Sequence, residues 1–136
     1  MYVRKKKPTL GICLGLQLMA NNSLEYGNHK GLSWIEGEII KLPVSGLNQK
    51  LPNIGWESVS FKDSPLFDGI KQPADFYFVH SFHLHQTNKT DIIASYQMGD
   101  KTITAAIQKD NIIATQFHPE KSQDNGLRLL ENFMKM

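Results

Sequence analysis

Residues 9–19, TLGICLGLQLM, decide the fold of this chain. A short apolar run enters a Gly-x-Cys-x-Gly turn and an apolar-spaced segment leaves it, which is typical of a strand that bends into a helix and holds a nucleophile at the bend. We expect Gly11 and Gly15 beside Cys13 because a Cβ at either position would collide with the crossing backbone. A thiol at the first turn of a helix lies near unpaired backbone N–H groups, which favour the thiolate. The pattern predicts either a nucleophile or a buried structural cysteine.

Composition narrows the class of protein. A length of 136 residues suits one domain with a real core, and 15 basic against 13 acidic residues leave a net charge of +2. That balance argues against nucleic acid or an anionic membrane as the main partner. The single cysteine excludes an internal disulfide, and no apolar run approaches the ~20 residues of a membrane span. Residues 1–7 lack the apolar stretch of a signal peptide, so we expect a cytoplasmic protein.

The rest of the chain predicts a mixed α/β arrangement. After the helix that leaves Cys13, residues 33–42 and 54–61 are predicted to form strands, and residues 64–70 a capped helical turn closed by Gly69. Residues 76–80 are predicted to be a strand covered on both faces, which brings residues 80–83 to a possible site at its end. An antiparallel meander is expected from residues 92–96, 102–107 and 112–117. A closing amphipathic helix is expected to bury Leu127, Leu130, Phe133 and Met134.

A thiolate nucleophile needs a base, and the base needs a third group to orient it. His118 and Glu120 suit these roles, because side chains two apart on an extended segment point the same way and Pro119 opposes helix formation. Gln17 lies four residues beyond Cys13, on the same helix face, where it can hold a substrate against the thiol or simply form a polar helix face.

Histidine also suggests a metal site as an alternative. Zinc could be bound by His80, His83 and His85 together with His118 and Cys13. If residues 80–85 are extended, however, His83 and His85 share one face and His80 points away, so we favour the thiol chemistry and expect no metal.

Three separated motifs resemble the class I glutamine amidotransferases: GICLGLQ at residues 11–17, FVHSF at 78–82 and QFHPEKS at 116–122. Residues 54–56 and the His-Pro-Glu-Lys-Ser form are most similar to the glutaminase subunits of imidazole glycerol phosphate synthase. The resemblance implies a three-layer, flavodoxin-like α/β domain with a mixed sheet. It spans nearly the whole chain.

The same resemblance implies the roles of individual residues. Cys13 would be the nucleophile, His118 the base and Glu120 its orienting partner. Leu14 would give a backbone N–H to the oxyanion, while Gln17, Ser81 and Phe82 would hold the substrate glutamine. No cofactor is implied.

The resemblance also implies a partner. Ammonia released from glutamine would pass to a (β/α)₈ cyclase subunit that makes imidazole glycerol phosphate in histidine biosynthesis. Lys121, Ser122 and the region around Trp56 would face that partner.

Members of the family have a substantial segment before the nucleophile strand, which includes a loop with a second oxyanion donor. We therefore expect residues 1–136 to be the C-terminal portion of an amidotransferase domain, with residues 2–7 the end of a preceding helix. The alternatives are a paralogue that supplies ammonia for amination of a surface sugar, a γ-glutamyl hydrolase that does not channel ammonia, and an inactive fragment that retains the triad residues.

Overall fold

A computed structural model describes residues 6–44, 49–85 and 88–136 of the chain. The expected helix end at residues 2–7 falls largely outside these ranges. The described strands are β1 (Thr9–Ile12), β2 (Asn22–Ser23), β3 (His29–Lys30), β4 (Glu38–Lys41), β5 (Asn53–Phe61), β6 (Ala74–His80), β7 (Phe82–His85), β8 (Ile92–Met98), β9 (Lys101–Lys109) and β10 (Ile112–Thr115). The helices are α1 (Leu14–Met19) and α2 (Gln123–Met134), with 3₁₀ turns η1 (Pro65–Phe67), η2 (Lys89–Asp91) and η3 (Pro119–Lys121). None of the described helices is long and apolar enough to cross a bilayer.

The main sheet has six strands in the order β1-β10-β9-β8-β5-β6. β1 is parallel to β10, with Ile12 opposite Thr115, whereas β8, β9 and β10 form the predicted antiparallel meander. The parallel pairing of β1 with β10 determines where the residues that follow these strands lie. Because β1 and β10 are parallel neighbours, the residues that follow them emerge at the same edge of the sheet.

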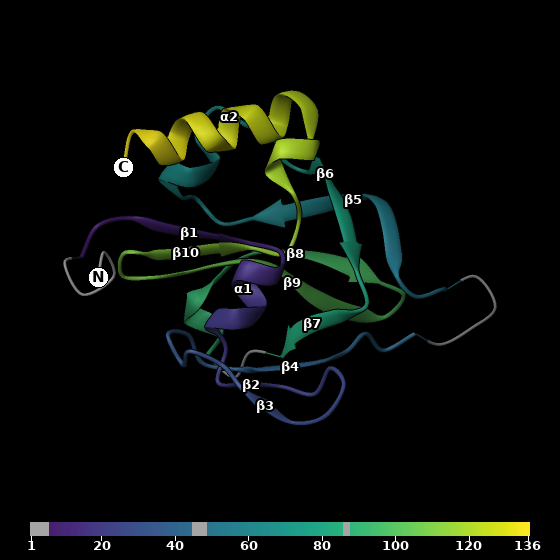
Figure 1. Ribbon diagram of the computed structural model, residues 1–136. Coiled ribbons are helices and arrows are strands. Elements are labelled where there is room, and N and C mark those ends of the chain that lie inside the picture. The colour runs from purple at the N-terminus through teal and green to yellow at the C-terminus, as the bar shows by residue number, and fades with distance from the viewer. Residues whose placement is uncertain (1–5, 45–48, 86–87) are drawn as a thin grey trace.

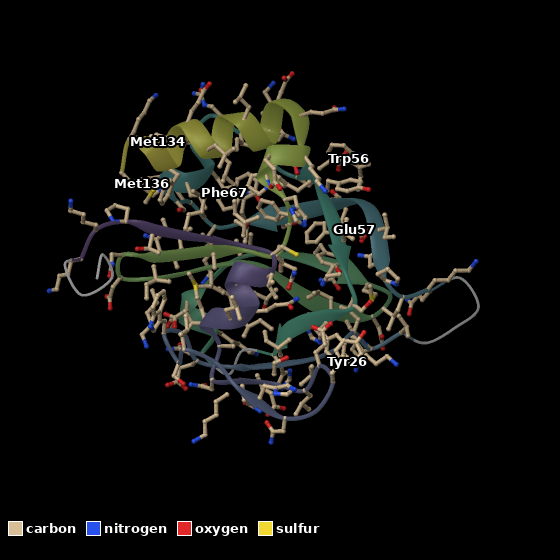
Figure 2. The ribbon with its side chains drawn as sticks, viewed as in Figure 1. Tyr26, Trp56, Glu57, Phe67, Met134 and Met136 are labelled. Atoms are coloured by element: carbon tan, nitrogen blue, oxygen red, sulfur yellow. The ribbon has the colours of Figure 1, made fainter. Side chains whose placement is uncertain are left out.

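The two faces of the main sheet are covered differently. α2 lies over one face, while α1 and the four-stranded sheet β3-β2-β4-β7 lie on the other (Figure 1). The first core joins Leu129 of α2 to aromatic residues that include Phe76, Phe78 and Phe117. Figure 2 shows Phe67, a member of this core, in the layer beneath α2. The second core joins Leu16 of α1 to residues of β4, β7, β9 and β10. These layers confirm the expected class I amidotransferase architecture.

Several local expectations were wrong in detail. Only Glu38–Lys41 of the predicted strand over 33–42 is extended, because Gly37 has a φ of 134° and breaks the segment. β6 lies at the edge of the sheet, and its side chains alternate between buried and more exposed positions, so one face of the strand is covered and the other is not. The predicted strand over 54–61 and the turn at η1 are confirmed, the latter with the Ser64 hydroxyl accepting from the Leu66 N–H.

The closing helix is present, but the face that it buries differs from the prediction. Its buried residues are Gly126, Leu129 and Asn132. Of the predicted residues, Phe133 packs partly buried against the first core, whereas Leu127 is 57% exposed. Met134, seen near the C-terminal end of α2 in Figure 2, is 80% exposed. Asn132 is buried because its amide donates to the carbonyls of Leu66 and Asp68, at 2.9 and 2.8 Å. These hydrogen bonds from Asn132 hold one face of α2 toward residues 66–68, and the periodicity of apolar residues does not reveal them.

Candidate active site

Cys13 occupies the predicted bend between β1 and α1. Its backbone has φ 53° and ψ −101°, a strained conformation for a residue with a Cβ. The Cys13 N–H donates to the carbonyl of Thr115 at 2.7 Å, which extends the β1–β10 pairing up to the bend. The strand-to-helix turn therefore holds the thiol at the edge where both strands end.

The two glycines that flank Cys13 differ in what an added Cβ would contact. A Cβ on Gly11 would lie 2.7 Å from Cε of Met19 and 3.1 Å from the carbonyl carbon of Gly15, so it would displace the Met19 side chain and crowd the backbone, in the direction predicted. A Cβ on Gly15 would meet nothing within 4 Å, so the steric argument was wrong there.

The Cys13 thiol is not poised as a thiolate in this structure. Burial raises its pKa, while the Leu14 N–H and the Gln116 side chain act in the opposite direction. The Gln116 amide lies 3.7 Å from Sγ, and the thiol lies 3.8 Å from the carbonyl oxygen of Val79. As expected, the backbone N–H at the start of the helix lowers the pKa of the thiol. Desolvation of the buried sulfur raises the pKa by more, so the net shift is upward.

His118 and Glu120 form the predicted pair. The Nδ1 atom of His118 lies 2.9 Å from Oε2 of Glu120, and the two side chains are 19% and 48% exposed. The predicted extended geometry was wrong, because Pro119 begins the 3₁₀ turn η3. Proline is favoured at the first position of a helical turn, where its missing N–H costs no hydrogen bond.

Ser122 holds this turn in place. It is 1% exposed, and its hydroxyl donates to the His118 carbonyl at 2.7 Å and accepts from the Tyr77 N–H at 2.9 Å. The His118 N–H in turn donates to the Tyr77 carbonyl at 2.9 Å. Ser122 is therefore buried beneath the turn, which corrects the expectation that it faces a partner; Lys121 is exposed.

His118 and Cys13 share an edge of the sheet without a direct hydrogen bond, as far as the described residues go. β10 ends at Thr115, opposite the last residue of β1, and His118 follows three residues later. The charges of Glu120 and Lys121 act on the pKa of the Cys13 thiol, which shows that the turn lies near the sulfur. Contacts between catalytic groups are often loose without substrate and shorten when it binds.

A cavity of about 290 Å³ opens beside the thiol. Every residue predicted to bind substrate lines it: Leu14, Gln17, Ser81 and Phe82. The side-chain amide of Gln17 donates to the Phe82 carbonyl at 3.3 Å and lies 3.5 Å from Oε1 of Gln116. The Oε1 atom of Gln17 is thus the atom of this amide that can accept from a ligand.

Sequence reasoning missed two residues of this site. Glu25 lines the cavity from the turn that follows β2, where its N–H donates to the Ser23 hydroxyl at 3.2 Å. It lies in a turn without periodicity, so no sequence pattern marks it. Gln116 belongs to a quoted motif, but only the structure shows its amide against the thiol.

His80 supports the wall of the cavity. Its Nδ1 atom lies 2.8 Å from the Phe82 carbonyl oxygen, so Nδ1 carries the proton. Its Nε2 atom lies 2.9 Å from the Tyr96 hydroxyl, which also accepts from the Asn53 amide at 3.2 Å. Burial lowers the pKa of His80 to about 4, so the ring is neutral and the Tyr96 hydroxyl donates to Nε2.

The histidines proposed as a metal alternative are not brought together. Both ring nitrogens of His80 are engaged, whereas His83 and His85 line a different cavity. The described part of the chain contains no group of three or more histidine, cysteine or carboxylate side chains arranged for a metal ion.

Comparisons with known proteins identify the family of this chain. Residues 1–136 match the family model for class I glutamine amidotransferases. The chain is 49% identical over 133 residues to imidazole glycerol phosphate synthase subunit HisH 1 of Campylobacter jejuni strain 81-176, covering 97% of this chain and 65% of that protein. It is 44% identical over 135 residues to subunit HisH of Aquifex aeolicus, covering 98% of this chain and 63% of that protein.

The chain thus spans slightly less than two thirds of these relatives. Among solved structures, a glutamine amidotransferase from Thermotoga maritima is similar in fold, with a TM-score of 0.62 at 18% identity, covering 98% of this chain and 50% of that one. The family match extends over every element described above. This chain belongs to the class I glutamine amidotransferase family.

Proposed function

We propose that the chain hydrolyses glutamine through a Cys13-His118-Glu120 triad. One observation carries the proposal. The parallel β1–β10 pair brings the Cys13 bend and the hydrogen-bonded His118–Glu120 pair to the same edge of the sheet, and a cavity lined by Cys13 opens beside the thiol. A nucleophile, a base and an orienting acid in this arrangement suit acyl transfer.

The chemistry proceeds through a thioester. His118 accepts the thiol proton as Cys13 attacks the side-chain amide carbon of glutamine, and the carbonyl becomes an oxyanion. The C–N bond then breaks as the imidazolium returns the proton to the leaving nitrogen, which departs as ammonia. Water, deprotonated by His118, hydrolyses the γ-glutamyl thioester to glutamate and restores the thiol.

The raised pKa of Cys13 makes His118 essential to this scheme. A thiol that is neutral before substrate arrives has to lose its proton during the attack. Glu120 accepts a hydrogen bond from Nδ1 of His118, which leaves Nε2 as the basic atom and stabilises the imidazolium. The Leu14 N–H, at the start of α1, has no partner within the helix and is suited to the developing oxyanion.

The cavity matches the ends of a glutamine molecule. Glu25 supplies a carboxylate, the only one among the described lining residues, which suits the α-ammonium group. Gln17 can accept from the same ammonium through Oε1, since its amide nitrogen is engaged by Phe82. Ser81 and Phe82 lie on the wall, where the Ser81 hydroxyl can donate to the α-carboxylate.

We propose further that the ammonia passes to the cyclase subunit of imidazole glycerol phosphate synthase for histidine biosynthesis. The names of the relatives support this assignment, because each is a subunit of that synthase. Trp56, labelled in Figure 2, is 45% exposed on β5. A cavity of about 370 Å³ is lined by Trp56 and by residues at the start of α2. With exposed Lys121 close in sequence to that start, this surface is our candidate for contact with the cyclase.

Ammonia release from glutamine, measured with the full chain alone and with a cyclase subunit, tests the proposal. Cys13→Ala should abolish release. Glu25→Gln should raise KM about 10- to 100-fold with little change in kcat, because it removes a charged contact with the bound substrate. Glu36→Gln, at an exposed position outside the cavity, is the matched control and should change neither constant.

Three results would contradict the proposal. Release that persists in Cys13→Ala would exclude the thioester route. Release that the cyclase neither stimulates nor captures would favour a hydrolase that does not channel ammonia, while no release under either condition would favour an inactive chain.

A further inference from the structure

A second cavity, of about 540 Å³, shares no lining residue with the Cys13 cavity. It is bounded by β7, β8, β9 and η2, and by Lys62 just beyond β5. Phe82 lines the Cys13 cavity, whereas the next three residues of β7, His83, Leu84 and His85, line the second one. The glutaminase chemistry uses no residue of this cavity.

His83 is the unusual residue of this second cavity. It is 6% exposed, and neither Nδ1 nor Nε2 has a hydrogen-bond partner among the residues that the structure describes. Burial, together with His80 and His85, lowers its pKa to about 4, so the ring is neutral and presents one donor and one acceptor. Buried polar atoms in native proteins are nearly always paired, which points to an occupant that hydrogen-bonds the ring.

The charges around the cavity indicate what else the occupant carries. Lys62 and Lys89 line it, and its described lining contains no carboxylate. The Lys62 ammonium donates to the Lys89 carbonyl at 3.4 Å, which holds its charge beside η2. The Thr102 hydroxyl accepts from the Gln97 amide at 2.8 Å and therefore keeps its own proton to donate.

We propose that this cavity binds a small hydroxylated organic anion, with its phosphate or carboxylate group between Lys62 and Lys89 and a hydroxyl group on His83. A hydroxyl both donates and accepts, so it can satisfy either nitrogen of a neutral imidazole, whereas an ionised oxygen can only accept from the N–H. Lysine ammonium groups recognise an anion as point charges and do not select phosphate over carboxylate, so the experiment has to distinguish the two.

Glycerol 3-phosphate, D-glycerate, inorganic phosphate and glycerol serve as probes with the full chain. Binding is followed through the ring ¹⁵N signals of His83 by NMR and through calorimetry. We expect saturable binding of glycerol 3-phosphate or D-glycerate that shifts the His83 ring signals, weaker binding of inorganic phosphate, and none of glycerol. The tighter of the two organic anions identifies the anionic group.

Variants at exposed positions keep the test independent of folding. Lys62→Gln and Lys89→Gln should each weaken binding about tenfold, since each removes one charged contact. Lys71→Gln, exposed and outside the cavity, should bind as the unchanged chain does. Unshifted His83 signals with every probe would overturn the proposal and leave water as the occupant. Equal binding by all three variants would also overturn it, as would binding of glycerol as tight as that of the anions.

Discussion

Replacing Tyr96 by phenylalanine tests the hydrogen-bond chain behind the substrate cavity. Tyr96 is 2% exposed, and its hydroxyl lies between Nε2 of His80 and the amide of Asn53. The substitution removes one oxygen atom and leaves the buried ring in place. The His80 Nε2 atom, in a residue that is 5% exposed, then has no donor and no access to water.

The size of the effect follows from that loss. An unpaired buried polar atom costs about 1–3 kcal/mol, and a chain of 136 residues has an unfolding entropy of about 0.3 kcal/mol/K. Tm should therefore fall by about 4–10 °C. KM for glutamine should also rise, because His80 holds the Phe82 carbonyl that positions Gln17.

Thermal denaturation by circular dichroism measures the first effect and a glutaminase assay the second. Tyr77→Phe is the matched control, since Tyr77 is only half-buried and packs edge-on against Trp56 at 5.6 Å. If Tyr96→Phe matched Tyr77→Phe in both Tm and KM, the Tyr96 hydroxyl would support neither the fold nor the site, and the proposed hydrogen-bond chain would be wrong.

Three further predictions concern stability and the catalytic turn. Gly11→Ala should lower the free energy of unfolding by about 1–3 kcal/mol, because the added Cβ overpacks the site. Gly15→Ala should raise it by up to about 1 kcal/mol, because alanine has the higher helix propensity. Urea denaturation that ranks the two variants in the reverse order would contradict the contacts described for these two glycines. Ser122→Ala removes both backbone hydrogen bonds of its hydroxyl, so kcat should fall together with Tm, and Ser122→Thr should restore part of kcat if the hydroxyl acts by positioning. His80 and His83 have pKa values of about 4, below the ordinary 6.5, so the unfolded chain binds more protons than the folded chain between these two pH values. The free energy of unfolding should therefore fall by about 3 kcal/mol per ring as the pH drops from 6.5 to 4. His83→Phe should remove the part of this fall that comes from one ring, and an unchanged pH dependence would argue against the burial of His83 as a neutral group.

The sequence predicted the parts of the molecule that depend on local patterns. Gly11 and Cys13 mark the bend because backbone sterics act within a few residues. The meander follows from short apolar runs separated by turn residues, and the pairing of His118 with Glu120 needs only two positions of separation. Local chemistry was therefore enough to predict the meander and the contact between His118 and Glu120, although the extended backbone expected for that contact was wrong.

The remaining features depend on contacts between segments distant in sequence. The face that α2 buries is set by Asn132, whose partners lie more than sixty residues away in the chain. Glu25 reaches the cavity from a turn without periodicity, and the pKa of Cys13 depends on how deeply the folded chain buries the sulfur. Spacing along the chain contains no information on these quantities.

The proposed reaction requires that Cys13 attack a glutamine carbonyl group with His118 as its base. Covalent labelling by the glutamine analogue 6-diazo-5-oxo-norleucine, with the modified residue identified by mass spectrometry, tests this step most directly. We expect labelling at Cys13 that glutamine blocks, that slows about 10²- to 10⁴-fold in His118→Ala, and that slows to a smaller degree in Glu120→Gln. Labelling of Cys13 at the same rate in His118→Ala, or no labelling in a folded chain with its cyclase present, would contradict the proposed triad.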